Sequence, residues 1–371
     1  MPFPRVLDAD VDESIVAGEQ RISADSHVTE PSDLWQRLPK SLRDRAPTWS
    51  PGGRGFRMDL RAGGWDPYER LKDLAFGGIS AEVLYPTQAN RAYLVEDHAL
   101  EEACFRAYND WLIEFCSAAP HRFWGLAMMS LWNIDHAVKE LERCKRAGLR
   151  GAAIGLCPPT HLPYSADHYE PFWAAAEELS MPLNLHINSG TNMNLRHSDR
   201  SGLLPDQVHK FDQQKAVGDL IGSGALDRYP KLNVVIAEAG AGWLAFYAQE
   251  FDYYKMTFSG TKQDLSRMPS EYIARQVYGT FISDRVAGQL LPNYGQDTWM
   301  WSNDYPHPAC TWPLSDRSIA ADLGHLERGI RAKVICQNAA RLYNDGELPP
   351  AADPPRGDHQ DLSAWNQEHW S

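Results

Sequence analysis

The sequence predicts a closed (β/α)8 barrel of the TIM type, with a long insertion after the first strand and a C-terminal tail. From residue 81 onward, apolar runs alternate with amphipathic helical segments, and this alternation implies parallel strands joined by right-handed crossovers. Eight strands can be placed in the 371 residues, which is typical of one barrel with insertions. A doubly wound open sheet is the alternative, but its glycine-rich first turn is missing from the sequence.

The N-terminal part of the chain is expected to form an arm, a strand and an insertion. Residues 1–20 are polar and are assigned to the arm, and the first strand is predicted over residues 21–28. Residues 31–80 contain several prolines and show no alternation, so they are expected to form a long excursion with a few short helices, which in a compact domain is usually functional. Surface arginines are mostly just solvated, but three in this insertion are candidate partners for a substrate carboxylate: Arg54, Arg57 and Arg61.

The remaining elements follow in order within a barrel domain that spans residues 21–344. Further strands are predicted over residues 81–86, 123–129, 150–157, 182–188, 233–239, 277–282 and 298–301. Helices are predicted over residues 96–119, 135–147, 168–179, 211–226, 242–256 and 285–291, with a terminal helix over 330–343. Residues 345–371 are rich in Pro, Asp and Gln and are expected to be a surface tail or disordered.

Composition limits the class of protein. The chain has 36 Lys and Arg against 49 Asp and Glu, and its net charge of −13 argues against nucleic acid or an anionic membrane as the main partner. No apolar run approaches about 18 residues and the N-terminus has no apolar signal region, so neither a membrane span nor secretion is predicted. The six cysteines lack metal-like spacing and are expected to be free thiols in the reducing cytoplasm.

Polar side chains end four of the predicted strands. In a barrel the C-terminal ends of all strands meet at one mouth, where active sites lie. A single histidine in an apolar strand is more often a hydrogen-bonded core residue, but agreement between four strand ends favours a site. Histidines and carboxylates together suit one divalent cation, with Zn²⁺ expected first and Mn²⁺ or Fe²⁺ as alternatives. The residues are Asp25, His27, His186, Glu238 and Asp304, from strands one, five, six and eight.

Asp304, Glu238 and His307 are the candidate catalytic residues. Asp304 would take a proton from a cation-bound water, although an Asp before Tyr-Pro is also ordinary turn chemistry. Glu238 would pass a proton to the leaving group or hold the substrate, and its alternative is a salt-bridged carboxylate beneath the site. His307 would hydrogen-bond the substrate or support the ion, and its alternative is a surface loop histidine.

The chain resembles the amidohydrolase-related family of metal-dependent TIM barrels, in the branch that includes aminocarboxymuconate-semialdehyde decarboxylase. The matching stretches are DSHVTEP at 25–31, LNLHINSG at 183–190, YPKLNVVIAEAGAGW at 229–243, WSNDYPHP at 301–308 and ICQNAARLY at 335–343. The resemblance implies metal ligands at Asp25, His27, His186 and Asp304. The chain departs from the family pattern twice: the usual His-x-His of strand one is Asp25-Ser26-His27, and the catalytic histidine after strand six is Glu238. No lysine ends strand four, so no carbamate-bridged pair of metals is expected.

The sequence favours a mononuclear metal-dependent hydrolase that acts on a small organic substrate through an activated water. One alternative is a nonoxidative decarboxylase of an aromatic or unsaturated acid, and another is a non-catalytic ligand-binding barrel. Four tryptophans near the predicted mouth favour an aromatic or apolar ligand, although aromatic residues more often pack in the core: Trp132, Trp243, Trp301 and Trp312. The insertion and the tail exceed what one barrel needs, so a homodimer is expected in which one of them crosses to the partner.

Overall fold

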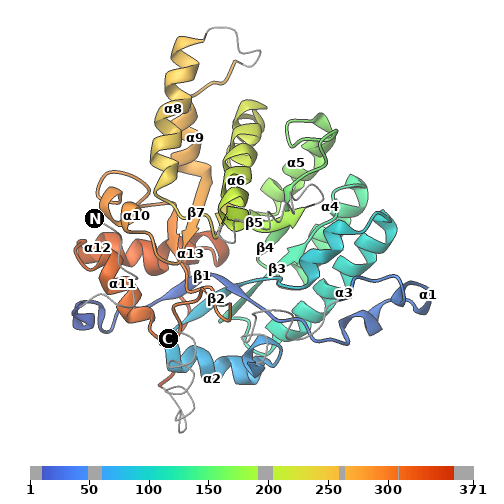
Figure 1. The fold of residues 1–371 in the computed structure, drawn as a ribbon, viewed down its shortest axis with the longest axis horizontal. Coiled ribbons are helices and arrows are strands. Elements are labelled where there is room, and N and C mark those ends of the chain that lie inside the picture. The colour runs from blue at the N-terminus through green and yellow to red at the C-terminus, as the bar shows by residue number, and fades with distance from the viewer. Residues whose placement is uncertain (1–10, 49–60, 191–203, 259–263, 308, 355–371) are drawn as a thin grey trace.

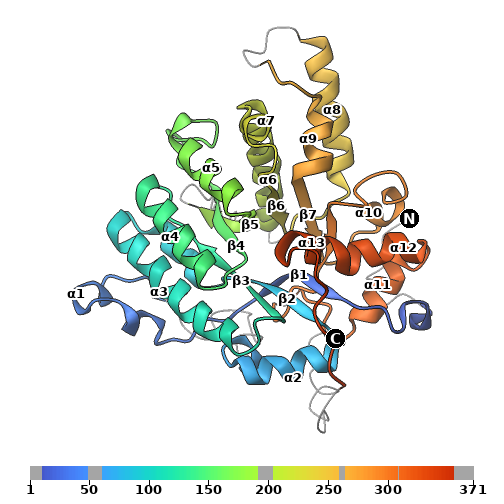
Figure 2. The ribbon, with the colours of Figure 1, turned by 180° about the vertical axis from the view of Figure 1, so that it is seen from behind.

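The structure, a computed structural model, is described for residues 11–48, 61–190, 204–258, 264–307 and 309–354. Within these ranges eight strands form one sheet in which each strand pairs in parallel with the next, in the order β1 to β8. Helices surround this sheet on its outer side, as Figure 1 and the reverse view in Figure 2 show. The predicted (β/α)8 barrel is therefore confirmed.

The strands are short and almost wholly buried; only Asn188 is exposed among their residues. Parallel barrel strands are covered on both faces, which is why continuous apolar runs marked them in the sequence. Each predicted strand is found with its ends within two residues of the predicted ones. The strands are β1 Ile22–His27, β2 Ala81–Tyr85, β3 Phe123–Met128, β4 Gly151–Cys157, β5 Leu183–Gly190, β6 Val234–Ala237, β7 Val277–Phe281 and β8 Trp299–Trp301.

The chain after β8 joins the barrel back to β1. The N–H of Asp304 donates to the carbonyl of Asp25 at 3.0 Å, and the N–H of His27 donates to the carbonyl of Tyr305 at 2.7 Å. The N–H of Asn303 donates to Ser23 Oγ at 2.9 Å. These bonds hold the loop that carries Asp304 against the strand that carries Asp25, so residues from the two ends of the barrel domain become neighbours.

The helices depart from prediction in four places. The helix predicted over 211–226 begins earlier and is followed by a separate turn, and the terminal helix over 330–343 is interrupted by a π-helical turn at Lys333–Gln337. Two helices were not predicted, α9 and α11, because each has only a short apolar face. The helices are α1 Lys40–Arg43, α2 Pro67–Gly77, α3 His98–Ser117, α4 Ile134–Arg146, α5 Glu170–Glu178, α6 Leu204–Gly222, α7 Ala225–Arg228, α8 Trp243–Thr257, α9 Pro269–Gln276, α10 Arg285–Leu290, α11 Ser315–Leu323, α12 Arg328–Ala332 and α13 Asn338–Tyr343. Short 3₁₀ turns lie at Glu13–Val16, Leu34–Arg37, Ala62–Gly64, Ala89–Leu94 and Asp167–Tyr169.

Helix α4 shows how sequence signals produce these elements. The Asn133 side chain accepts from the N–H of His136 at 3.2 Å and so caps the N-terminus. Ile134, Ala137, Leu141 and Cys144 form its buried stripe, at the spacing of a helix face that packs on a sheet. Two residues beyond the helix, Gly148 adopts φ 96°, a conformation that favours glycine and ends the helix.

Helix α2, within the insertion, buttresses the mouth. The fully buried Arg70 pairs with Glu82 of β2 at 2.7 Å and donates to the carbonyl of His27 at 2.8 Å. Arg61, a predicted substrate partner, instead pairs with Asp73 of α2 at 2.5 Å and lies 4.5 Å from the Trp312 ring centroid. Arg54 and Arg57 lie outside the described residues.

The described parts of the arm and the tail lie against the barrel. Arg331 of α12 pairs with Glu19 at 2.6 Å and donates to the carbonyl of Ile15 at 3.2 Å. Gln20 donates to the carbonyl of Pro349 at 2.6 Å, so the start of the tail packs beside the arm. All six cysteines are buried and free, and none of the described helices is long and apolar enough to cross a membrane.

Candidate metal centre

Six ionisable side chains meet at the C-terminal end of the barrel. His27 Nε2 lies 3.0 Å from His186 Nε2, 3.6 Å from Asp25 Oδ1 and 3.5 Å from Asp304 Oδ1. His186 Nε2 lies 3.2 Å from Glu238 Oε2, and Asp304 Oδ1 lies 3.1 Å from His307 Nδ1. The structure thus brings together all the residues that the sequence named as metal-ligand or catalytic candidates: Asp25, His27, His186, Glu238, Asp304 and His307.

The backbone determines which nitrogen of each central imidazole carries a proton. His27 Nδ1 lies 3.0 Å from the carbonyl oxygen of Pro86, and His186 Nδ1 lies 2.7 Å from that of Ile187. A carbonyl oxygen only accepts, so each Nδ1 carries the proton and each Nε2 carries a lone pair. The two lone pairs therefore face each other at 3.0 Å with no proton between them. This arrangement is repulsive by itself, and it is the form in which neutral imidazoles bind a cation.

Some carboxylate oxygens around these imidazoles are buried without a hydrogen-bond donor among the described residues. Asp25 Oδ1 and both carboxylate oxygens of Asp304 are buried and accept no hydrogen bond from the described residues. Burying a carboxylate oxygen without a partner costs a folding free energy on the order of several kcal/mol, unless a cation or hydrogen-bond donors compensate for it. Two imidazole nitrogens and several carboxylate oxygens within reach of one another fit a single divalent cation.

Burial controls the protonation of the centre. It raises the pKa of Asp25 well above the ordinary value, and the neighbouring charges of Asp304 and Glu238 raise that pKa further. Burial lowers the pKa of His27 and lowers that of His186 to about 4, so both imidazoles are neutral near pH 7. A cation among these groups opposes the rise at Asp25, because positive charge favours the ionised carboxylate.

Comparison with known proteins assigns the chain to a family. The family model described as amidohydrolase matches residues 25–344. The chain belongs to the amidohydrolase family. A gamma-resorcylate decarboxylase from Rhizobium sp. is 26% identical over 337 residues, which cover 84% of this chain and 91% of that protein. Another, from Polaromonas sp., is 29% identical over 282 residues, which cover 72% of this chain and 83% of that protein. Family and relatives together identify this chain as an enzyme.

Solved structures share the fold. An amidohydrolase from Mycobacterium avium subsp. paratuberculosis gives a TM-score of 0.74 at 19% identity and covers 88% of this chain and 99% of that one. A dihydroxybenzoic acid decarboxylase from Polaromonas sp., solved with bound manganese and the inhibitor 2-nitroresorcinol, gives 0.69 at 22% identity and covers 89% of this chain and 98% of that one. A 5-carboxyvanillate decarboxylase from Sphingomonas paucimobilis gives 0.70 at 21% identity, with 88% and 99% covered.

A buried threonine that the sequence did not single out links two site residues of this amidohydrolase. Thr280 Oγ1 of β7 accepts from the N–H of Glu238 at 2.9 Å and donates to Asp25 Oδ2 at 3.0 Å. Its only proton is therefore committed to Asp25, and Asp25 Oδ1 is left facing the imidazoles. A threonine in an apolar strand is an ordinary strand former, so the sequence carried no signal of this role.

Glu30 holds the loop after β2 against the site. Its carboxylate accepts from three successive N–H groups, those of Thr87 at 3.0 Å, Gln88 at 2.8 Å and Ala89 at 3.2 Å. The same loop supplies the carbonyl of Pro86 that faces His27. Glu30 itself lies shortly after the end of β1 in the sequence. Burial raises the pKa of Glu30 to about 7, with the backbone hydrogen bonds opposing the rise.

His307 lies within the site, so the surface-histidine alternative is wrong. Its ring stacks on His27 with centroids 3.8 Å apart, and its side chain is 16% exposed. Its Nε2 lies 3.1 Å from Thr87 Oγ1, while its Nδ1 faces Asp304. His307 therefore connects the loop after β2 to the carboxylate after β8.

Glu238 and Asp304 share an uncommon backbone conformation. Each follows the last residue of its strand closely and each has φ 56°, in the left-handed region that a glutamate rarely adopts. Backbone strain of this kind clusters at functional sites, where the surrounding structure holds it in place. Here the bond from Thr280 to the N–H of Glu238 helps to hold it.

The four tryptophans differ in their relation to the mouth. Trp301 and Trp312 are fully buried, and Trp243 Nε1 donates to the carbonyl of Gly240 at 3.0 Å. Trp132 lines a cavity between the loops that follow β3 and β4. The sequence-based hint of an aromatic ligand therefore rests on Trp132.

Proposed function

We propose that this enzyme is a metal-dependent nonoxidative decarboxylase of a hydroxylated aromatic acid. The observation that carries the proposal is the pair of imidazole lone pairs that face each other at 3.0 Å among unpaired carboxylate oxygens. The sequence alone favours hydrolysis, but the similarity to gamma-resorcylate decarboxylases supports the decarboxylase alternative better. The same enzyme relatives disfavour the non-catalytic barrel.

Asp25, His27, His186 and Asp304 would hold one divalent cation. Manganese in a solved structure of the same fold favours Mn²⁺ over the Zn²⁺ that the residue types alone suggest first. When bound, the cation supplies positive charge that holds the substrate carboxylate and an adjacent oxygen and stabilises the charge that develops on cleavage. Thr280 and His307 would orient two of the ligands, Asp25 and Asp304 respectively.

Glu238 is our candidate for the acid that delivers a proton. Its side chain is 21% exposed at the mouth, whereas that of Asp304 is fully buried. In the reaction the bond between the ring and the carboxylate breaks, the electron pair stays on the ring carbon, CO₂ leaves, and the carbon takes one proton. Glu238 as a carboxylic acid would donate this proton and recover one from solvent. Asp304 is the second acid–base candidate.

The decisive experiment uses the Mn²⁺-loaded enzyme without oxygen. We expect 2-hydroxybenzoate or one of its dihydroxy derivatives to yield CO₂ and the phenol in equal amounts, with no redox cofactor added. In D₂O the product should carry one deuterium at the carbon that lost the carboxylate. Turnover of an ester or amide panel without CO₂ release from any acid would instead establish the hydrolase and contradict the proposal.

A homodimer remains part of the proposal, and helix α8 offers a candidate interface. The helix projects from the barrel in Figure 1, and Leu244 is its one fully buried residue in the described structure. Exposed apolar patches of this kind mark interaction sites, and C2 symmetry is the default for two copies. Five large apolar side chains on or beside the helix are more than half exposed: Phe246, Tyr253, Tyr254, Met256 and Phe258.

Light scattering separates the three candidate interfaces. A chain that ends at Glu347 tests the tail, and the double variant Phe246→Ser, Tyr253→Ser tests α8. If both proteins remain dimers, the insertion is the remaining candidate interface. A monomeric full-length protein at micromolar concentration would contradict the homodimer altogether.

A further inference from the structure

The loop that carries Glu238 is bonded to a carboxylate from the next loop of the barrel. Asp284, three residues after the end of β7, accepts from the N–H of Ala241 at 2.8 Å and from that of Gly242 at 2.9 Å, both at Oδ2. Its Oδ1 accepts from the N–H of Ala287 at 2.8 Å and so caps α10. None of the roles assigned above uses this carboxylate.

The two N–H groups lie immediately before helix α8, in a loop that packs directly on the first turn of α10. A Cβ atom on Gly242 would lie 2.9 Å from Val286 Cγ1 and 3.0 Å from the nitrogen of Ala287. Ala241 is fully buried, so its N–H cannot turn to solvent in place of Asp284. A buried donor without an acceptor is costly, and the loop would have to rearrange if Asp284 were removed.

Segment 238–242 is therefore held at both ends from β7 and the loop that follows it. Thr280 Oγ1 accepts from the N–H of Glu238 at one end, and Asp284 accepts from the other end. Between them the backbone is left-handed twice, with φ 56° at Glu238 and φ 73° at Gly240. A left-handed glutamate costs on the order of 1–3 kcal/mol and persists only when the surrounding structure fixes it.

Asp284 is itself anchored to a buried residue of helix α11. Its N–H donates to Asp322 Oδ2 at 2.9 Å, and Asp322 is 3% exposed. Arg285 Nε lies 3.5 Å from Asp322 Oδ1. The carboxylate that holds the Glu238 loop thus has a fixed position of its own, set by the outer layer of helices.

We propose that Asp284 is a positioning residue that orients Glu238 for proton delivery. The inference rests on the proposed function, in which Glu238 is the acid, and adds the residue that keeps this acid in place. Glu238 Oε2 lies 3.2 Å from His186 Nε2, so it is already close to the predicted cation ligands. A displacement of about 1 Å at a reacting group can cost about 10²-fold in rate, which is why the shape of its loop matters.

Asp284→Ser removes the bonds to the loop and leaves α10 capped. Serine is a good N-cap, so its hydroxyl replaces the oxygen that accepts from Ala287, and no oxygen remains for Ala241 and Gly242. In the Mn²⁺-loaded enzyme we expect kcat for decarboxylation to fall by about 10- to 100-fold. KM and metal content should stay near the wild-type values, because the cation ligands lie on other loops. An unchanged kcat would overturn the proposal.

A double-mutant cycle separates positioning from a general loss of structure. In Glu238→Gln there is no proton to orient, so adding Asp284→Ser should lower kcat by no more than about twofold further. Equal fold-losses from Asp284→Ser in the wild-type and Glu238→Gln backgrounds would show that Asp284 acts independently of Glu238, and would overturn the proposal.

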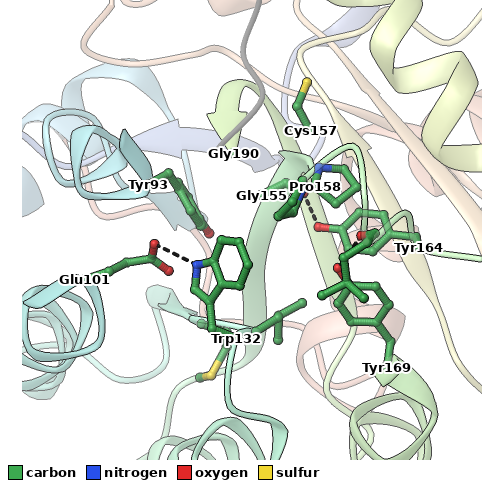
Figure 3. A pocket seen from close by; sticks show the side chains of 13 residues that line it. Tyr93, Glu101, Trp132, Gly155, Cys157, Pro158, Tyr164, Tyr169 and Gly190 are labelled. Atoms are coloured by element: carbon green, nitrogen blue, oxygen red, sulfur yellow. Dashed lines mark hydrogen bonds between the residues drawn. The ribbon is translucent and has the colours of Figure 1, made fainter. Parts of the chain in front are cut away.

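Asp97→Ala is the matched control, because Asp97 also accepts from two N–H groups, those of Ala99 at 3.0 Å and Leu100 at 3.2 Å. Asp97 caps α3, the helix that carries Glu101 beside the small cavity of Figure 3, and no residue of the metal centre lines that cavity. Asp97→Ala should therefore cost stability, as a lost cap does, and leave kcat near the wild-type value. A fall in kcat as large as that of Asp284→Ser would overturn the specific role of Asp284.

Hydrogen exchange tests the bonds to the loop without any turnover. In the Mn²⁺-loaded protein the amides of segment 238–242 should exchange about tenfold faster or more in Asp284→Ser, as expected for the loss of about one hydrogen bond, and at the wild-type rate in Asp97→Ala. Equal exchange in Asp284→Ser and the wild type would overturn the proposal. Faster exchange in a protein that releases no CO₂ from any acid would overturn only the decarboxylase function, and the cycle is then run on the ester or amide that the enzyme hydrolyses.

Discussion

The two sides of the barrel mouth differ in whether their buried polar atoms are hydrogen-bonded. On the side of β1, β5 and β8, Asp25, His186 and Asp304 direct unpaired oxygens or a lone pair into a buried space. On the side of β2 to β4, the hydroxyls of Tyr93 and Tyr164 are bonded to backbone carbonyls and the rings form an apolar wall. Unpaired buried polar groups are costly until an ion compensates them, whereas groups that are already hydrogen-bonded have no need of a ligand. The contrast shows which part of the mouth suits a cation and which part is already satisfied by its own backbone.

Removing an imidazole lone pair should have the largest effect. His186→Ala is expected to lose stoichiometric Mn²⁺ and to lower decarboxylation by about 10³-fold or more, since a catalytic cation supplies several kcal/mol of stabilisation. His136→Ala, which removes an exposed histidine of α4, is the control and should retain both the bound Mn²⁺ and the decarboxylation rate. Metal analysis of the purified proteins decides the outcome, and full occupancy in His186→Ala would refute the ligand assignment.

Glu238→Gln tests proton delivery without disturbing the cation. The amide keeps the shape of the side chain but has no proton to give, so kcat should fall by about 10²–10⁴-fold while metal content and melting temperature stay near those of the wild type. Single-turnover measurements of CO₂ release on the same preparations would show whether chemistry is slowed. Near-normal turnover would transfer the acid–base role to Asp304.

The buried acid of the aromatic side should make stability depend on pH. Folding raises the pKa of Glu101 from 4.5 to about 7, so the folded state binds more protons between these values. Stability should therefore fall as pH rises through this window, by at most about 3 kcal/mol, and the penalty should be complete above it. In Glu101→Gln the decline in unfolding free energy between pH 4.5 and 7.5 should be smaller by that amount. Urea unfolding measures it, with Glu102→Gln as the reference; equal slopes in the two variants would contradict the shift.

Thr280→Val should have the smallest of these effects and act only on the cation side. It removes the hydroxyl between Asp25 and Glu238 at nearly constant volume, and loss of such an orienting group lowers metal affinity or activity by about 10- to 100-fold. Thr280→Ser should restore Mn²⁺ affinity. Thr311→Val, at a buried threonine whose hydroxyl has no partner among the described residues, is the control. Equal Mn²⁺ affinities of Thr280→Val and Thr280→Ser would rule out the orienting role.

The sequence by itself determined the strands and the chemistry at their ends. Buried parallel strands must be apolar throughout, so even the three residues of β8, Trp299–Trp301, were recognisable. Asp25, His186 and Asp304 stood out because ionisable residues at the ends of such runs are otherwise rare. Helices α9 and α11 were missed since a short apolar face gives little periodicity to detect.

Only the tertiary structure decided how these groups are oriented and what lies beside them. The tautomers of the two imidazoles depend on the carbonyls of Pro86 and Ile187, and a backbone carbonyl has no side-chain signature in a sequence. The role of Thr280 depends on two hydrogen bonds, one with Asp25 on β1 and one with Glu238 just after β6. The small cavity lined by Glu101 and Trp132 exists because separate loops enclose a space, and the position of a space is a property of packing rather than of any residue.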